Sequence, residues 1–412
     1  MNMSVSVHRS AYLVLLLALA VAPWPLGSNR DWAWPILSTL LTLAALLSLF
    51  GKPFALTVHQ KVSVAAFGVL ASWMMLQFFW THDFYQTRSE LLKTIMLMAL
   101  FLVTVRVLDG RERQETVIYL LVLIGLMQAC LGGVQQLMFD LPRSRGSFPN
   151  PNHFAGYLEI VICLAIGAMI ALQGQPKSGR PMSPTEMITG ELGRLRIAII
   201  IMVVALVMSR SRMGNVAFFT SILVTSVIAF YYTRSINRYT VILLTSILVL
   251  DVFIIGNYFG IERLGERLAK ASTEATSRID LQTYNASIIR DQPWTGVGAG
   301  SYETAFNQYR DAAVAKKATH AENEYAEFLV ELGIIGCLPL LVILLTGLHA
   351  QVSLLSSMTP PFERGVAFGC LAATISLLIH GIADVNLQIP ANSMLFVLAL
   401  ALPQALIANR ST

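Results

Sequence analysis

The chain has 412 residues, of which 55% are hydrophobic and only 13% are charged, and its formal net charge is +5. Soluble domains carry about twice this share of charged residues, so the composition excludes a soluble globular protein and indicates a membrane protein that crosses the bilayer many times. In such a protein a small excess of Lys and Arg reflects the orientation of the loops, and it does not indicate a nucleic-acid partner.

Apolar blocks recur along the whole chain, and most are long enough to cross a bilayer, which takes roughly 17–25 residues. We expect about 12 transmembrane helices, near residues 11–26, 33–50, 62–80, 90–107, 116–138, 153–173, 195–209, 213–232, 240–259, 323–347, 364–382 and 390–408. The sequence therefore predicts one all-α integral membrane domain over residues 1–412. A loop with amphipathic helical character, residues 260–322, is inserted between the ninth and tenth helices.

The distribution of Lys and Arg predicts the orientation of these helices. If the N-terminus lies in the cytoplasm, the short inner segments carry more Lys and Arg than the short outer ones, as the positive-inside rule requires. Long loops are left out of this comparison because they cross the membrane largely regardless of charge. We therefore expect both termini in the cytoplasm, and the segments around Arg145, Arg210, His320 and Asp384 on the outer side.

A polar motif at residues 319–325 ends the long loop and leads into the tenth apolar block. Thr319 and Glu322 have the spacing of a capping box, so we expect His320 in the first turn of that helix. Helical steps from His320 reach three carboxylates, those of Glu324, Glu327 and Glu331. An ionisable residue as deep in the membrane as Glu331 indicates a functional site.

Two arginine-containing turns are expected on the same outer side. In residues 143–153, prolines and a glycine favour an irregular backbone, Asn150 and Asn152 offer hydrogen bonds, and Asn152 is a candidate helix cap. Residues 209–214 join two apolar blocks with almost no loop, which places two guanidinium groups, those of Arg210 and Arg212, at or below the headgroup level. These arginines either anchor helix ends or bind the oxygens of a phosphate in a bidentate way.

Two further polar segments are expected on the outer side of the membrane. Residues 291–302 contain a GxGxG pattern with no preceding buried strand and no Walker lysine, so they do not predict a nucleotide site. Trp294 and Tyr302 are instead expected near the membrane surface, where their rings can stack on sugars. Asp384 is expected either to pair with an outer arginine or to belong to a simple polar turn. The spacing of acidic, His and Cys residues predicts no metal site and no cofactor.

These residue types suit one kind of ligand, a lipid-linked diphosphate. Arginines would hold the diphosphate and stabilise the negative charge that develops as it leaves. His320 would take a proton from an acceptor hydroxyl or orient that hydroxyl. The pattern indicates transfer of a glycan from a polyprenyl-diphosphate donor, without metal and without a nucleotide sugar.

Five motifs also carry a family resemblance. RSRGSFPNPNHFAGYL, SRSRMG, RDQPWTGVGAGSY, HAENEYAEFLVELGIIG and HGIADVNLQIPAN resemble, in this order, motifs of the O-antigen ligase and O-antigen polymerase superfamily, which also holds bacterial O-linking oligosaccharyltransferases. The resemblance runs over residues 143–392. It implies a bacterial inner-membrane protein with a GT-C-like helical fold, which moves a glycan from undecaprenyl diphosphate with inversion and without metal. In the ligase branch the acceptor is lipid A–core.

The resemblance also implies roles for single residues. His320 matches the essential histidine of the family, and Arg210 or Arg212 matches the arginine at its tight outer turn. Arg278 matches the arginine early in the long loop, although the tryptophan that often follows it is absent here. From their placement we add Arg145 to the donor site, together with a set of supporting residues: Asn150, Asn152, Glu324, Tyr325 and Asp384.

Four functions stay open, and the ligase is favoured among them. A polymerase would extend the lipid-linked glycan, and a protein O-oligosaccharyltransferase would use a protein acceptor. As a non-enzyme, a flippase would move the lipid-linked glycan across the membrane. The lack of an internal repeat and the gathering of polar motifs on one side disfavour a transporter.

Overall fold

The computed structural model describes residues 3–50, 55–174, 189–233, 281–310, 318–356 and 358–411. These residues form helices joined by turns, and they contain no strand. Residues 281–291 are helical, and the other elements are α1 (Met3–Val21), η1 (Leu26–Ser28), α2 (Ala33–Leu49), α3 (Val58–Gln77), α4 (Phe84–Val107), α5 (Arg111–Met138), α6 (Pro151–Gln173), α8 (Glu191–Met208), α9 (Arg212–Thr233), α12 (Tyr302–Tyr309), α13 (Glu324–Ser353), α14 (Pro361–His380), η3 (Asn386–Gln388) and α15 (Pro390–Ser411).

Each apolar block expected within the described residues coincides with a helix, and the all-helical class is confirmed. The block at 240–259 lies outside the described residues. Six of the described helices are long and apolar enough to cross a membrane, namely α5, α6, α9, α13, α14 and α15, whereas α1 and α2 are shorter apolar helices. The expected number of about 12 spans is therefore not confirmed.

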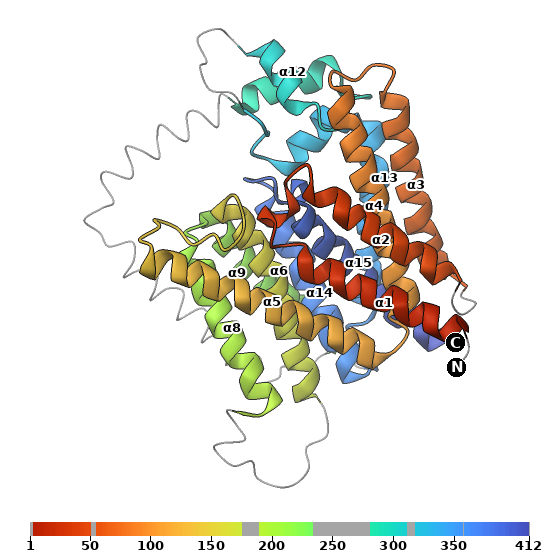
Figure 1. Cartoon of the computed structure of the whole chain (residues 1–412), viewed down its shortest axis with the longest axis vertical. Helices are drawn as coiled ribbons and strands as arrows, with labels where there is room; N and C mark the ends of the chain where they lie inside the picture. Colours follow the sequence, from red (N-terminus) through yellow and green to blue (C-terminus); the bar gives the residue numbers. More distant parts are fainter. Residues whose placement is uncertain are drawn as a thin grey trace.

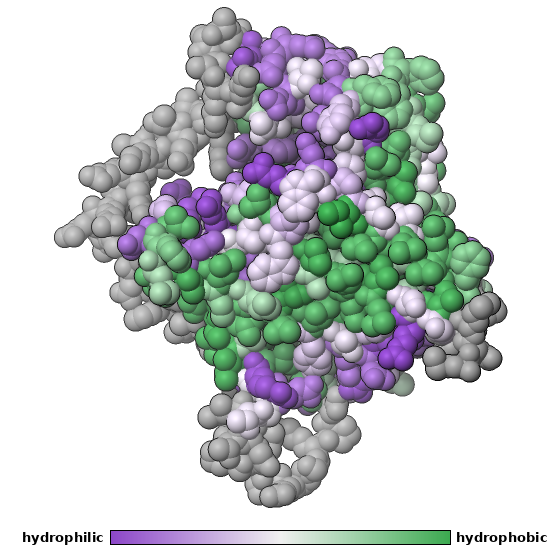
Figure 2. All heavy atoms as spheres, viewed as in Figure 1, coloured by the Kyte–Doolittle hydropathy of each residue, from purple (hydrophilic) through white to green (hydrophobic). Residues whose placement is uncertain are grey.

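The helices lie side by side in a bundle with two distinct ends. Figure 1 shows α12 at one end of the bundle and both chain termini toward the other. Hydrophobic side chains form a broad band across the face shown in Figure 2, and hydrophilic ones gather at both ends, most densely around α12. This distribution is expected of a protein that lies across a bilayer.

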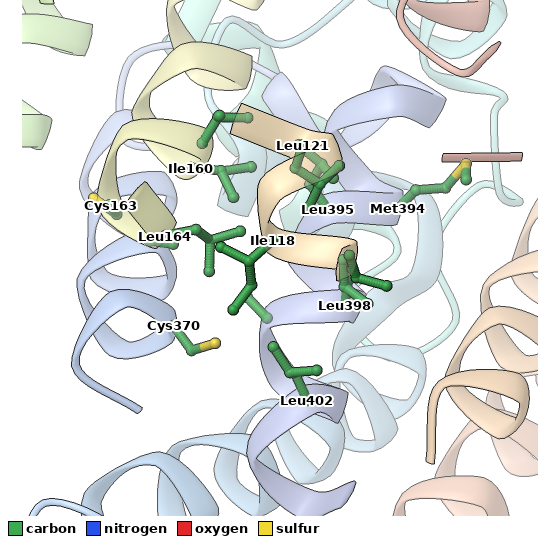
Figure 3. Packing of buried hydrophobic residues seen from close by; sticks show 14 of the residues in the cluster. Ile118, Leu121, Ile160, Cys163, Leu164, Cys370, Met394, Leu395, Leu398 and Leu402 are labelled. Atoms are coloured by element: carbon green, nitrogen blue, oxygen red, sulfur yellow. The ribbon is translucent and has the colours of Figure 1, made fainter. Parts of the chain in front are cut away.

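Helices α6 and α14 form the centre of the bundle. Glycines let their backbones approach closely: a Cβ atom at Gly369 would lie 2.7 Å from the Cys163 carbonyl oxygen, and Gly167 lies against Gly365 in the same way. Figure 3 shows Cys163 and Leu164 of α6 in one core with Leu121 of α5 and residues of α15. This close packing holds α6 and α14 together, and the polar motifs lie toward the opposite ends of the two helices, at the start of α6 and the end of α14.

Helix α13 is interrupted inside the membrane-length segment. Gly333 has φ 64° and ψ 179°, a conformation that essentially only glycine adopts. Residues 293–298 enter this break, where Val297 N donates to Val330 O at 2.9 Å. The Gln77 side chain of α3 donates to two further carbonyl oxygens, those of Thr295 and Glu331. Because an unpaired backbone group is costly in a membrane, the loop, the broken helix and α3 stabilise one another.

Candidate functional site

The imidazole of His320 is held by a buried carboxylate. Its Nδ1 lies 2.7 Å from Glu327 Oε1, and the second oxygen of Glu327 accepts from Ala321 N at 2.8 Å. The His320 side chain is 40% exposed, whereas that of Glu327 is 1% exposed. The carboxylate therefore fixes the ring from inside the protein, and Nε2 is the nitrogen left to meet a ligand.

The charges around His320 change its acidity. Burial alone lowers the pKa of the imidazole, but the Glu327 carboxylate and hydrogen bond, with the charges of Glu331 and Glu324, raise the pKa to about 9. The ring consequently carries a proton at neutral pH.

The start of α13 differs from the expected capping box. Asn323 is the N-cap, and its side chain accepts from Tyr325 N and Ala326 N. His320 therefore lies in the turn before α13 and not in its first helical turn. The prediction from Thr319 and Glu322 was wrong because Asn323, adjacent to the helix, is itself a strong capping residue.

Residues 381–388 wrap around the start of α13. Glu324 N donates to Gly381 O at 2.8 Å, and Leu387 N donates to Glu324 Oε2 at 2.8 Å. The Tyr325 hydroxyl donates to Leu378 O at 2.6 Å. Glu324 thus attaches the segment that contains Asp384 to the start of α13, next to His320, and Tyr325 attaches the last turn of α14 to it. Their supporting role in the reaction stays a prediction.

Asp384 is a buried carboxylate that binds residues at the start of α6. Its Oδ2 accepts from Asn152 Nδ2 at 2.6 Å, and its Oδ1 lies 3.5 Å from His153 Nε2. Burial alone raises the pKa of Asp384, but the hydrogen bonds from His153 and Val385 N and the charges of His153 and His380 lower it to about 2. Asp384 therefore stays ionised at physiological pH.

Arg143 connects this carboxylate to the turn between α8 and α9. One guanidinium nitrogen donates to Asn152 Oδ1 at 2.6 Å, and Nε donates to Ser209 O at 2.7 Å. Asp384 thus reaches an arginine through Asn152, and the arginine is Arg143, which the sequence did not single out. Asn150, not Asn152, caps α6 by accepting from Asn152 N at 2.9 Å.

The four arginines predicted to bind the donor differ in their location and in their exposure. Arg210 has a positive φ of 53° in the tight turn and is half-buried, and Arg212 begins α9 with an exposed side chain. Arg145 is exposed close to this turn, since Ser144 N donates to Met208 O at 3.1 Å. Arg278 lies outside the described residues.

The GxGxG segment has a structural role. Gly298 has φ 108° and packs so tightly against Thr81 that a Cβ atom would overlap the threonine hydroxyl. Trp294 is 61% exposed, as expected for a residue near a surface. Tyr302 is 1% exposed and its hydroxyl donates to Asn285 at 2.6 Å, so the expectation that its ring meets sugars was wrong.

Two carboxylate contacts of the site were not predicted from the sequence. Glu327 lies on the predicted stripe from His320, but its contact with the ring could not be read from spacing alone. Glu159 is a single carboxylate in an otherwise apolar α6, a signal that marks functional sites in membranes. No group of His, Cys, Asp and Glu suited to a metal ion occurs among the residues that the structure describes.

Together the apolar helices and this charged cluster define a helical integral membrane protein with an ionisable site at the ends of α6, α8, α13 and α14. Residues 197–341 match the sequence model of the family described as O-antigen ligase. The match includes the turn with Arg210 and Arg212 and the start of α13 with His320. This match supports the resemblance to the O-antigen ligase and polymerase superfamily, whose members are glycosyltransferase-like enzymes, and it covers three of the five motifs. A comparison with curated proteins finds no match.

Proposed function

We propose that the chain is an O-antigen ligase-type glycosyltransferase, which moves a glycan from undecaprenyl diphosphate to lipid A–core at the periplasmic face of the bacterial inner membrane. The observation that carries this proposal is the His320–Glu327 pair beside a hydrogen-bonded path to the α8–α9 turn. That path runs from Glu324 through residues 381–388 and Asn152 to Arg143.

In the proposed reaction an acceptor hydroxyl attacks the anomeric carbon of the glycan. A new glycosidic C–O bond forms, the bond from this carbon to the diphosphate oxygen breaks, and undecaprenyl diphosphate leaves with the bonding electrons. His320 Nε2 takes the hydroxyl proton, while Glu327 orients the ring through Nδ1. Attack on the side opposite the diphosphate inverts the configuration of this carbon.

Arginines provide the binding energy for the leaving diphosphate. Arg210 and Arg212, with Arg278 and Arg145, are proposed to bind its oxygens, because guanidinium groups keep their charge in a partly dry site and bind phosphate through two hydrogen bonds. Asn150, Asn152 and Asp384 then support the turn through Arg143. In this proposal metal ions are not needed, since the arginines stabilise the developing charge.

The proposal includes an arrangement in the membrane. Both termini face the cytoplasm, the domain has a GT-C-like fold, and the loop of residues 260–322 is periplasmic. Membrane lipids surround the apolar band seen in Figure 2.

A reconstituted reaction tests the function. Purified protein in lipid is given a polyprenyl-diphosphate glycan and lipid A–core in the presence of EDTA, and products are separated by gel and identified by mass spectrometry. We expect glycan on lipid A–core. Longer glycan that remains on the polyprenyl diphosphate would show a polymerase instead, and transfer to neither acceptor would contradict the proposed function.

A further inference from the structure

A second histidine–carboxylate pair lies deeper in the bundle. His380 Nδ1 is 2.8 Å from Glu159 Oε1, and Ser376 Oγ donates to Glu159 Oε2 at 2.7 Å. Both the His380 and the Glu159 side chains are 0% exposed. Ionisable groups are costly inside a membrane protein, and where they persist they usually serve function. The proposed reaction gives this pair no part.

Glu159 lies against the first turn of α9, directly after the turn that carries Arg210 and Arg212. It lies seven residues after Asn152, about two helical turns along α6. A Cβ atom added to Gly214 would lie 2.8 Å from Glu159 Oε1 and 2.9 Å from Ser211 Oγ. The carboxylate therefore packs directly against the turn that begins α9.

His380 is linked in a similar way to the segment that contains Asp384. It is the last residue of α14, and residues 381–388, which wrap the start of α13, follow it directly. The Glu159–His380 contact thus joins three chain segments at one point: α6, the α8–α9 turn and the end of α14. Each of these segments carries a motif of the proposed donor site.

We propose that Glu159 and His380 form a positioning pair, which fixes the turn with Arg210 and Arg212 relative to the Asp384 segment and so sets the shape of the diphosphate site. This inference rests on the proposed function, and neither residue is proposed to touch the substrate. A buried hydrogen-bonded pair is suited to this task because removing one partner leaves the other buried and unpaired.

The test compares two substitutions of the same residue. His380→Leu removes the group that meets Glu159, whereas His380→Asn keeps an N–H donor near the position of Nδ1. Thr374→Val is the matched control, because Thr374 lies in the same helix and accepts from the buried Gln351 side chain at 2.9 Å, away from the motifs of the site. The measurements are binding of undecaprenyl diphosphate by the purified protein in lipid and the Tm of each variant.

We expect His380→Leu to bind undecaprenyl diphosphate about tenfold more weakly or worse, with His380→Asn and Thr374→Val within about threefold of the natural protein. Equal binding by His380→Leu would overturn the proposal. So would an equal loss in His380→Asn, because a role in geometry tolerates a group that keeps the contact.

The experiment distinguishes failure of the proposed donor site from failure of the positioning role. If the natural protein does not bind undecaprenyl diphosphate, the proposed donor site fails as well, whereas normal binding with no effect of His380→Leu removes the positioning role alone. If His380→Leu does not fold, Ser376→Ala replaces it, since it removes one of the two hydrogen bonds to Glu159. Weaker binding by Ser376→Ala would then support the proposal, and unchanged binding would overturn it.

Discussion

At the scale of single residues, the acidity of His320 limits how it can act. With a pKa of about 9, the ring is mostly protonated at neutral pH, and a general base works only in its unprotonated form. Transfer by the proposed mechanism should therefore speed up as the pH rises. The same charges that hold the ring in place also reduce the fraction that is ready to accept a proton.

The pH dependence of transfer tests this interpretation. We expect kcat/KM of the natural protein to rise with pH and to level off above about 9. Glu327→Gln removes the main charge that raises the pKa of His320, so its plateau should begin at lower pH, at a reduced rate because the ring is held less firmly. A rate that stays constant up to pH 9 and falls above it would show that the protonated ring is active and would contradict the base role.

Replacing arginine with lysine at the α8–α9 turn separates a guanidinium site from a patch of positive charge. Arg210→Lys and Arg212→Lys keep the charge but lose the paired donors, so each should lower kcat/KM by about tenfold or more. Arg194→Lys is the control, because Arg194 is exposed in the first turns of α8, toward the other end of that helix. Full activity of both lysine variants at the turn would show that any positive charge suffices there.

At the scale of helices, apolar block length predicted where the described helices lie, but it did not predict how they interact. The break in α13 depends on residues far apart in the chain, since Gln77 and residues 293–298 supply the hydrogen bonds that its backbone loses. The helix starts depend on a choice between neighbouring capping residues. Asn150 caps α6, where Asn152 was expected to do so, and Asn323 caps α13, where a capping box from Thr319 to Glu322 was expected.

A substitution at the break measures its importance for the fold. Gly333→Ala puts a side chain where φ is 64° and where a Cβ atom would overlap the Trp294 carbonyl oxygen. The strain of such a backbone conformation costs about 1–3 kcal/mol, so the Tm of the purified protein should fall. Gly68→Ala in α3 is the control, because no atom lies within 4 Å of its added Cβ. An unchanged Tm for Gly333→Ala would show that the break is not needed for stability.

At the scale of the whole molecule, the distribution of Lys and Arg predicted that four polar segments lie on one side of the membrane. The contacts of Arg143, Asn152, Asp384 and Glu324 join these segments into one hydrogen-bonded group. The individual pairs could not be predicted, because they depend on how α6 and α14 are rotated against each other. Spacing alone also did not separate Arg145, which is exposed, from Arg143 two residues earlier. Glu159 could have been singled out as the single carboxylate of α6, but its pairing with His380 could not be predicted.

The orientation in the membrane is a separate prediction. In a background without native cysteines, a cysteine that replaces Arg145 should react with a membrane-impermeant maleimide in intact spheroplasts. A cysteine that replaces Arg410 near the C-terminus should react only after lysis. Labelling in the opposite order would place the His320 site on the cytoplasmic side and would contradict transfer in the periplasm.

The most direct test of the central claim compares the natural protein with His320→Ala in the reconstituted transfer reaction, with undecaprenyl-diphosphate binding measured on the same preparations. We predict that His320→Ala folds and binds undecaprenyl diphosphate normally but forms product about 100-fold more slowly or worse, the loss typical of a missing general base. Product formation by His320→Ala at nearly the natural rate would contradict the assignment of this histidine, and with it the proposed chemistry of the site.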